Sequence, residues 1–295
     1  MKKIFSSVMP LLTATSLLFI MAPLSAEIIV SDSFESGDMS SPGYNGFSWA
    51  RNNRTSIVTM DPGPKSIWHN GVRDIDGEDW KDWTAYNGDN SLRFRYPPGV
   101  NLSEQRFNMS NSHPELWMSF WVRIPDNFNL IGGQTKFFSI WTDGYSQHGE
   151  GSTVWMDYNK DGVMRVTHSA GGYTVSKAYE KPVQVFHPID DRGRWMQITV
   201  RLVVESFENA SDGIMQVWHR WDGESEYTMT HEALDWALKV PSGDINGWSA
   251  GYLMGWVNTP YTEDTEWLID DFLLSTSSLI GAKPKPPLNP VIVNQ

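Results

Sequence analysis

Residues 115–141, ELWMSFWVRIPDNFNLIGGQTKFFSIW, decide the fold. Over residues 115–124, large apolar side chains occupy every even position, and the odd positions hold Glu, Trp, Ser, Trp and Arg. Side chains of a strand point to opposite faces with a period of two, so this segment predicts a strand with one face in the core. The other face combines aromatic and charged groups that suit a flat, hydroxylated ligand: Glu115, Trp117, Trp121 and Arg123.

Two later segments, residues 195–204 and 213–221, repeat this pattern of one apolar face and one polar face. Amide and guanidinium groups can bind hydroxyls and carboxylates, and indole rings can stack on sugars. Gln197 and Arg201 are the candidates for contact with a carboxylate. Gln216, Trp218 and Arg220 are further candidates for substrate binding. The alternative is an ordinary solvated face beneath covering loops.

Turns rich in Gly, Asn and Asp separate these short strands, and helical periodicity is almost absent. This pattern predicts an all-β fold, an antiparallel β-sandwich or jelly roll of two curved sheets with a concave groove. The polar faces would line that groove. One helical turn is expected over residues 232–237.

The chain divides into three segments. Residues 1–26 have the features of a secretory signal peptide: Lys2 and Lys3, an apolar stretch, and small residues before Glu27. An uncleaved anchor is the alternative. Residues 27–278 are expected to form the jelly-roll domain, and residues 279–295 a Pro-rich, extended tail. We therefore expect a secreted or periplasmic protein that is not held at a membrane after the signal is cleaved.

The charge and the cysteine count exclude several classes of protein. The formal net charge is −12 at pH 7, and it becomes −14 when the signal, which carries two lysines and no acids, is removed. This balance argues against nucleic-acid binding, although a local basic groove can still bind an acidic ligand. The absence of cysteine excludes disulfides, thiolate chemistry and Cys-based metal sites. We expect a monomer.

Several short motifs occur one after another over residues 115–275. The first group consists of Trp121-Val122-Arg123-Ile124, a Pro-Asp-Asn-Phe turn, Gly132-Gly133 and Lys136. The second consists of Asp161-Gly162, Trp195, Asp212-Gly213, Trp218 and Asp270-Asp271. This order resembles the jelly-roll polysaccharide lyases of the glucuronan-lyase and alginate-lyase type, in the concanavalin A-like lectin/glucanase superfamily. Two features depart from that pattern: Lys136 lies two residues further from the glycine pair, and His168 stands where a tyrosine is expected.

The resemblance implies metal-independent β-elimination on an acidic, uronate-containing polysaccharide such as alginate or glucuronan. The reaction needs a group that neutralises the uronate carboxylate, a base for the C5 proton and an acid for the C4 oxygen. The candidate catalytic residues are Lys136, His148, Tyr158 and His168, with base and acid left unassigned. Trp141, Tyr145 and Arg165 join the candidate substrate-binding residues.

Each catalytic candidate has a structural alternative. Lys136 can be a solvated lysine at a strand end, whereas Tyr158 and His168 share the phase of apolar neighbours and can be core residues. No cofactor is expected to be required for catalysis. A structural Ca²⁺ at Asp32, Asp270 and Asp271 stays open, because Ca²⁺ takes carboxylate oxygens.

Two other functions stay open. A non-catalytic, lectin-like module would use Trp117, Trp121 and Trp218 for stacking on sugars. A glycoside hydrolase on the same fold is disfavoured, since no strand shows the alternating acids that supply a pair of catalytic carboxylates.

Overall fold

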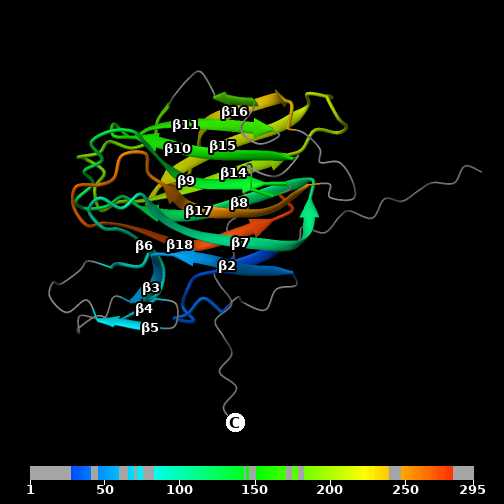
Figure 1. Ribbon diagram of the computed structural model, residues 1–295. Coiled ribbons are helices and arrows are strands. Elements are labelled where there is room, and N and C mark those ends of the chain that lie inside the picture. The colour runs from blue at the N-terminus through cyan, green and yellow to red at the C-terminus, as the bar shows by residue number, and fades with distance from the viewer. Residues whose placement is uncertain are drawn as a thin grey trace, which may run out of the picture.

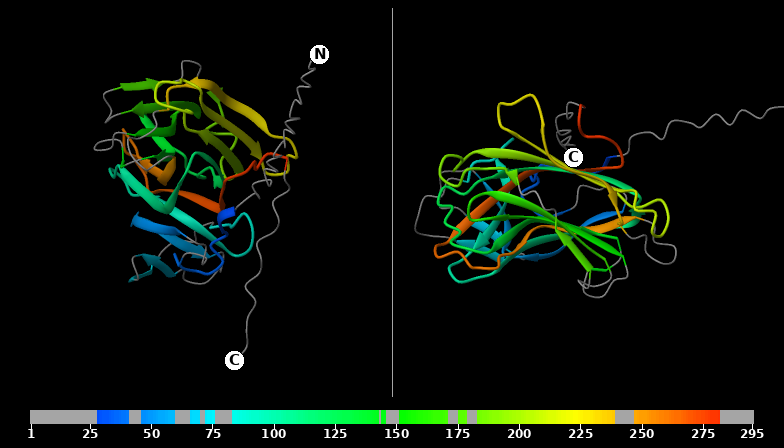
Figure 2. Two further views of the ribbon diagram at one scale, coloured as in Figure 1. Left: turned by 90° about the vertical axis from the view of Figure 1, so that its right-hand side faces the viewer. Right: turned by 90° about the horizontal axis from the view of Figure 1, so that it is seen from above.

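The computed structural model describes residues 28–40, 46–59, 66–69, 72–75, 83–142, 144–145, 151–170, 175–178, 183–238 and 247–281. The described residues form strands, turns and loops, and no helix occurs among them. Two sheets lie one over the other in Figure 1, and the turned views in Figure 2 show them as two layers. Within the same ranges no helix is long and apolar enough to span a membrane.

The first sheet has ten strands. In spatial order they are β16 (Thr228–Trp236), β15 (Gly213–Trp221), β14 (Trp195–Val203), β8 (Glu115–Arg123), β18 (Thr265–Ser275), β6 (Asn90–Tyr96), β3 (Thr55–Thr59), β4 (Ser66–His69) and β5 (Val72–Ile75), with β1 (Ile28–Asp32) paired to β18. Strand β8, the first strand of residues 115–141, therefore lies in the middle of the sheet, between β14 and β18.

The second sheet has eight strands. They are β12 (Val175–Ala178), β11 (Val163–Ala170), β10 (Ser152–Asn159), β9 (Gln134–Trp141), β17 (Trp248–Trp256), β7 (Leu102–His113) and β2 (Phe47–Asn53), with β13 (Val183–Gln184) paired to β11. The strand pairings of both sheets are antiparallel. The all-β sandwich predicted from the alternating pattern is confirmed.

One hydrophobic core fills the space between the sheets. It takes Met118 and Phe120 from β8 and Phe138 and Ile140 from β9, all fully buried. Each sheet therefore turns one face to the core and one face outward. The helical turn expected over residues 232–237 is wrong: this segment continues β16, whose alternating burial fits an edge strand paired with β15.

A β-bulge in β9 decides which face Lys136 occupies. Phe138 pairs with Met156, but Lys136 pairs with Asp157, so Phe137 is an extra residue in β9. Both Phe137 and Phe138 are fully buried in the core. The extra residue turns Lys136 to the outer face of the second sheet, next to Asp157.

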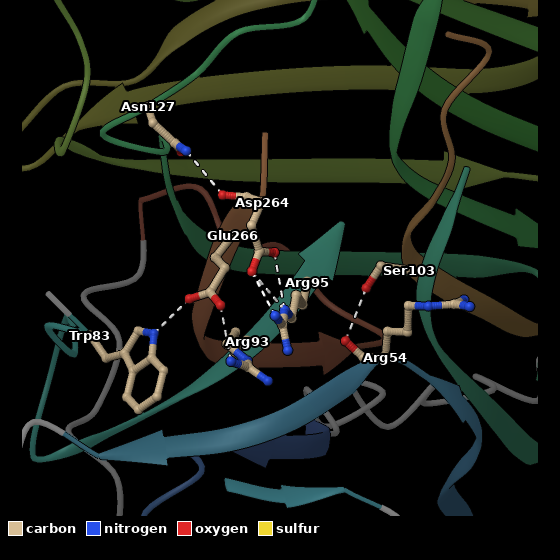
Figure 3. Close-up of polar contacts among 8 residues, drawn as sticks. All are labelled: Arg54, Trp83, Arg93, Arg95, Ser103, Asn127, Asp264 and Glu266. Atoms are coloured by element: carbon tan, nitrogen blue, oxygen red, sulfur yellow. Dashed lines mark hydrogen bonds and ion pairs between the residues drawn. The ribbon is translucent and has the colours of Figure 1, made fainter. Parts of the chain in front are cut away.

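Ion pairs join the strands of the first sheet at its outer face. Arg93 Nη1 lies 3.0 Å from Glu266 Oε1, and the same carboxylate accepts a hydrogen bond from the indole of Trp83 (Figure 3). Arg95 contacts Asp264 with two donors. These pairs fix β6 to β18 and leave their arginines engaged within the protein.

Candidate active site on the outer face of the second sheet

The residues predicted from the sequence divide between the outer faces of the two sheets. One set lies on the first sheet: Glu115, Trp117, Trp121, Arg123, Gln197, Arg201, Gln216, Trp218 and Arg220. The other set belongs to the second sheet and the residues that follow β9: Lys136, Trp141, Tyr145 and Arg165. Because the core separates the two outer faces, Lys136 and Arg201 do not converge in one groove. The concave groove itself stays a prediction.

The tryptophans on the outer face of the first sheet are buried. Trp117 and Trp218 stack on each other with 5.6 Å between ring centroids, and Trp121 stacks on Tyr86 at 3.8 Å. Their exposed fractions are only 5%, 8% and 3%. A sugar ring needs an open indole face, which these three side chains do not present in this structure, and sugar stacking on them stays a prediction.

Polar side chains on the same face satisfy one another. Arg201 donates to Glu115 at 2.8 Å and to Gln216 at 3.3 Å. Arg220 donates to Gln197 at 2.6 Å, and Arg123 pairs with Asp126 at 3.0 Å. A ligand carboxylate would have to displace partners already in place, so we interpret this face as a structural network.

Two of the four predicted catalytic residues lie in the core. The Tyr158 hydroxyl is fully buried and lies 3.2 Å from the Tyr261 hydroxyl, and burial raises its pKa well above the usual value for tyrosine. His168 is 6% exposed and lies 3.2 Å from the Ser152 hydroxyl. Both side chains are buried, as their alternative as core residues expects, and a catalytic role of either stays a prediction. His148 lies outside the described residues.

Lys136 stands at the centre of a row of charged residues across the second sheet, here called the lysine row: Glu104, Lys136, Asp157 and Arg165. Asp157 is the cross-strand neighbour of both Lys136 and Arg165. Arg165 Nη2 lies 3.2 Å from Asp157 Oδ2, and the Trp155 indole donates to the same oxygen. Within the described ranges, Lys136 Nζ has no hydrogen bond or ion pair.

Burial shifts two pKa values in the lysine row. Desolvation lowers the pKa of the Lys136 ammonium, and the negative charges of Asp157 and Glu104 oppose that shift. Desolvation raises the pKa of Asp157, against the effect of Arg165 and Lys136. A lysine whose ammonium is disfavoured, and whose Nζ is unpaired in the described part of the chain, can release its proton and act as a base.

Aromatic rings flank the lysine row on one side, here called the aromatic cluster: Trp141, Tyr145 and Tyr252. The guanidinium of Arg106 lies 5.3 to 5.9 Å from the centroids of all three rings. Arg106 also donates to Glu104 at 2.8 Å, which connects the aromatic cluster to the lysine row. The Tyr145 and Tyr252 hydroxyls lie 3.3 Å apart.

Gly255 lets the Tyr252 ring lie along β17 toward the lysine row. A Cβ at Gly255 would stand 2.7 Å from Tyr252 Cε2, and the glycine has a φ of 135° that other residues rarely adopt. Tyr252 pairs with Ser139, the position after Lys136 on the outer face of β9. The bulge adds a residue between Ser139 and Lys136, so Tyr252 and Lys136 share the outer face at a spacing longer than that of regular diagonal neighbours.

Several buried polar atoms on this face lack a partner among the described residues. They are Ser139 Oγ, Asp157 Oδ1, Arg165 Nε, Thr167 Oγ1 and Ser169 Oγ. Buried polar groups are nearly always hydrogen-bonded in proteins, so such atoms mark places where a ligand or ordered water bonds. All five belong to β9, β10 or β11, around the lysine row.

The charges of this face fit an anionic ligand. Arg106, Lys136 and Arg165 carry positive charge, and Glu104 and Asp157 carry negative charge, which leaves one positive charge in excess while Lys136 is protonated and none once it is neutral. The face therefore offers guanidinium groups for an anion together with a lysine and phenolic hydroxyls.

Sequence reasoning missed Glu104, Arg106, Asp157 and Tyr252. For Asp157 a signal was present, because it alternates with the buried Met156 and Tyr158 and so had to face outward. Glu104 and Arg106 alternate in the same way with the buried Gln105 and Phe107. The sequence did not indicate that these strands share a sheet with Lys136.

Two of the carboxylates considered as calcium ligands already accept hydrogen bonds from protein groups. Asp32 accepts hydrogen bonds from Phe34 N and the Trp49 indole, and Asp270 accepts from Tyr86 N and Asn87 N. Burial raises the pKa of Asp270 to about 8 and that of Asp271 to about 6. The described residues contain no group of three or more metal-ligating side chains, and a structural Ca²⁺ at Asp32, Asp270 and Asp271 stays a prediction.

Fold and site together define a jelly-roll sandwich with a charged and aromatic outer sheet face. Among solved structures, the PL-14 alginate lyase from Aplysia kurodai is similar, with a TM-score of 0.50 and 12% identity over 76% of this chain and 99% of that chain. Alginate lyase vAL-1 from Chlorella virus matches with a TM-score of 0.44 and 14% identity, over 75% of this chain and 91% of that chain.

A xylan β-1,4-xylosidase from Bacillus halodurans is also similar, with a TM-score of 0.40 and 12% identity, over 80% of this chain and 41% of that chain. No protein-family model matches the sequence, and no curated protein matches it. At 12% identity the likeness to the Aplysia kurodai enzyme shows the fold alone.

Proposed function

We propose that this protein is a secreted polysaccharide lyase that cleaves an acidic, uronate-containing polysaccharide by β-elimination on the outer face of the second sheet. The observation that carries the proposal is Lys136, a desolvated lysine with Nζ unpaired in the described part of the chain, which the bulge in β9 holds on the same outer face as Arg165 and Tyr252. The jelly-roll fold shared with the alginate lyase from Aplysia kurodai supports it.

In the proposed reaction, neutral Lys136 takes the C5 proton of the uronate. The electron pair of the C5–H bond forms the C4–C5 double bond, and the C4–O bond breaks. The leaving oxygen takes a proton from the lysine ammonium formed in the first step. Arg165 and Arg106 stabilise the negative charge that builds up on the carboxylate. The proposal needs no metal or cofactor.

The test is to incubate the protein with alginate, glucuronan or ulvan and to follow the ultraviolet absorbance of the unsaturated uronate that elimination creates. A rise in absorbance with one of these polymers supports the proposal. Binding without a rise indicates a carbohydrate-binding module, and new reducing ends without a rise indicate a hydrolase.

Two variants locate the site. Lys136→Met removes the proposed base and should lower kcat by roughly 10²- to 10⁴-fold. Arg201→Gln changes a half-buried arginine on the opposite face and should leave kcat within about twofold. If Arg201→Gln abolishes activity while Lys136→Met retains it, the site lies on the first sheet and the proposal is wrong.

A further inference from the structure

Trp256 is an exposed tryptophan at the end of β17. Its exposed fraction is 49%, whereas Trp117, Trp121, Trp141 and Trp218 are at most 8% exposed. A single exposed apolar side chain is common in proteins and needs a second observation before it indicates a binding site. The position of Trp256 on the second sheet and a neighbouring arginine supply that observation.

Trp256 lies on the same outer face as the lysine row. It pairs with Leu102 of β7, and opposed residues of an antiparallel pair point to the same face. Leu102 shares the phase of Glu104 and Arg106 along β7, while Ser103 and Gln105 between them are buried. Trp256 is therefore an open aromatic ring on the proposed active face.

A local break in β17 holds Trp256 in place. Met254 has a φ of 56° and Gly255 a φ of 135°, so the strand leaves regular geometry just before the tryptophan. The Tyr96 hydroxyl fills the gap between β7 and β17: it lies 3.0 Å from the Ser103 carbonyl and 2.8 Å from the Gly255 carbonyl. Such strained backbone often occurs at ligand sites.

Arg54 brings a positive charge to the same place. Its Nη1 donates to the carbonyl of Leu102, the cross-strand partner of Trp256, at 3.1 Å and to the Asn53 side chain at 2.8 Å. Both acceptors are neutral, and no carboxylate pairs with Arg54 within the described ranges. Figure 3 shows Arg54 set apart from the carboxylates of Asp264 and Glu266, which bind other arginines.

We propose that Trp256 and Arg54 form a subsite for a uronate unit of the polymer, the indole stacking on the sugar ring and the guanidinium pairing with its carboxylate. Three residues separate Tyr252 from Trp256 on β17, and the bridge between Val257 and Thr135 places Trp256 next to Lys136 across the two strands. A polymer whose reacting unit lies at Lys136 therefore has a neighbouring unit within reach of Trp256. The subsite rests on the proposed function for the kind of polymer it binds.

The experiment measures binding in the Lys136→Met background, so that turnover does not consume the ligand. Affinity gels containing alginate, glucuronan or ulvan report polymer binding, and calorimetry with a trimer and an octamer of the retained polymer reports chain-length dependence. Trp256→Ala and Arg54→Gln should each weaken trimer and octamer binding about tenfold. Trp256→Phe should restore most of the octamer affinity.

The matched control is Phe207→Ala, which removes an exposed aromatic ring, 68% exposed, from a loop of the first sheet. It should change neither affinity. If Trp256→Ala and Arg54→Gln bind the trimer and the octamer as tightly as the parent does, the subsite is refuted.

The two proposals fail separately. If the wild-type protein creates no unsaturated product but Trp256→Ala weakens octamer binding, the lyase proposal is refuted. The subsite is then retained as part of a binding module. If the product forms and neither variant binds the oligomers more weakly than the parent, the subsite alone is refuted. If none of the three polymers is retained by the parent protein, both proposals are overturned.

Discussion

Tyr158 offers a test that separates a core tyrosine from a catalytic one. Its hydroxyl lies 3.2 Å from the Tyr261 hydroxyl, and Tyr261 also accepts a hydrogen bond from the Trp267 indole at 3.1 Å. All three side chains are at most 1% exposed. Tyr158→Phe should therefore affect stability and leave lyase activity unchanged.

The number of hydrogen bonds sets the size of the effect. Tyr158→Phe removes one buried hydrogen bond but leaves Tyr261 bonded to Trp267, so the free energy of unfolding should fall by about 1 kcal/mol. Tyr261→Phe leaves both the Tyr158 hydroxyl and the Trp267 indole without this acceptor and should cost about 3 kcal/mol. The double variant should cost less than the two single variants together, because the shared bond is lost once.

Thermal unfolding and the ultraviolet lyase assay measure the two quantities on the same samples. For a domain of this size, Tm should fall by roughly 3 °C in Tyr158→Phe and by roughly 9 °C in Tyr261→Phe. If Tyr158→Phe keeps its Tm and loses activity, the tyrosine takes part in the reaction and the location of the site on the outer face is refuted.

Three further predictions concern the charge of the site, a buried histidine and a turn. Asp157→Asn removes a negative charge that raises the pKa of Lys136, so the pKa of Lys136 should fall further. The acidic limb of the kcat/KM profile should therefore move to lower pH. A move to higher pH would exclude Lys136 as the base. Burial lowers the pKa of His231 from 6.5 to about 4, so the unfolded chain takes up the proton first on acidification. The stability that neutral His231 contributes above pH 6.5 is lost as pH falls toward 4, by about 2 kcal/mol between about pH 7.5 and pH 5. Urea unfolding should show that loss in the wild type and a correspondingly smaller loss in His231→Gln. Gly162→Ala would place a Cβ 2.0 Å from the Phe186 carbonyl oxygen at a φ of 73°, and should lower the free energy of unfolding by roughly 2 kcal/mol or more, measured by the same method.

The period-two pattern predicted the strands well, because alternation depends on local geometry. Residues 115–123 form β8 with the apolar even positions in the core, and the Asp161-Gly162 turn joins β10 to β11 as expected. Each of these features is fixed within about ten residues of sequence.

The assembly of the site could not be predicted in the same way. Strands of both sheets have one apolar and one polar face, so alternation does not show that Arg201 and Lys136 belong to different sheets. Trp121 looked free for a ligand because Tyr86, which covers it, lies 35 residues earlier in the chain. Its burial depends on long-range packing that alternation does not report.

The extra residue at Phe137 has a consequence for how such a site can arise or be redesigned. Deleting Phe137 would restore simple alternation and leave Lys136 opposite Asp157 on the outer face, whereas pairing at the present length without the bulge would turn the lysine toward the core. The bulge thus allows one strand to place two adjacent phenylalanines in the core and still present a lysine outside. Sequence libraries that insert or delete single residues at positions 136–138 would show which lengths keep the lysine outside.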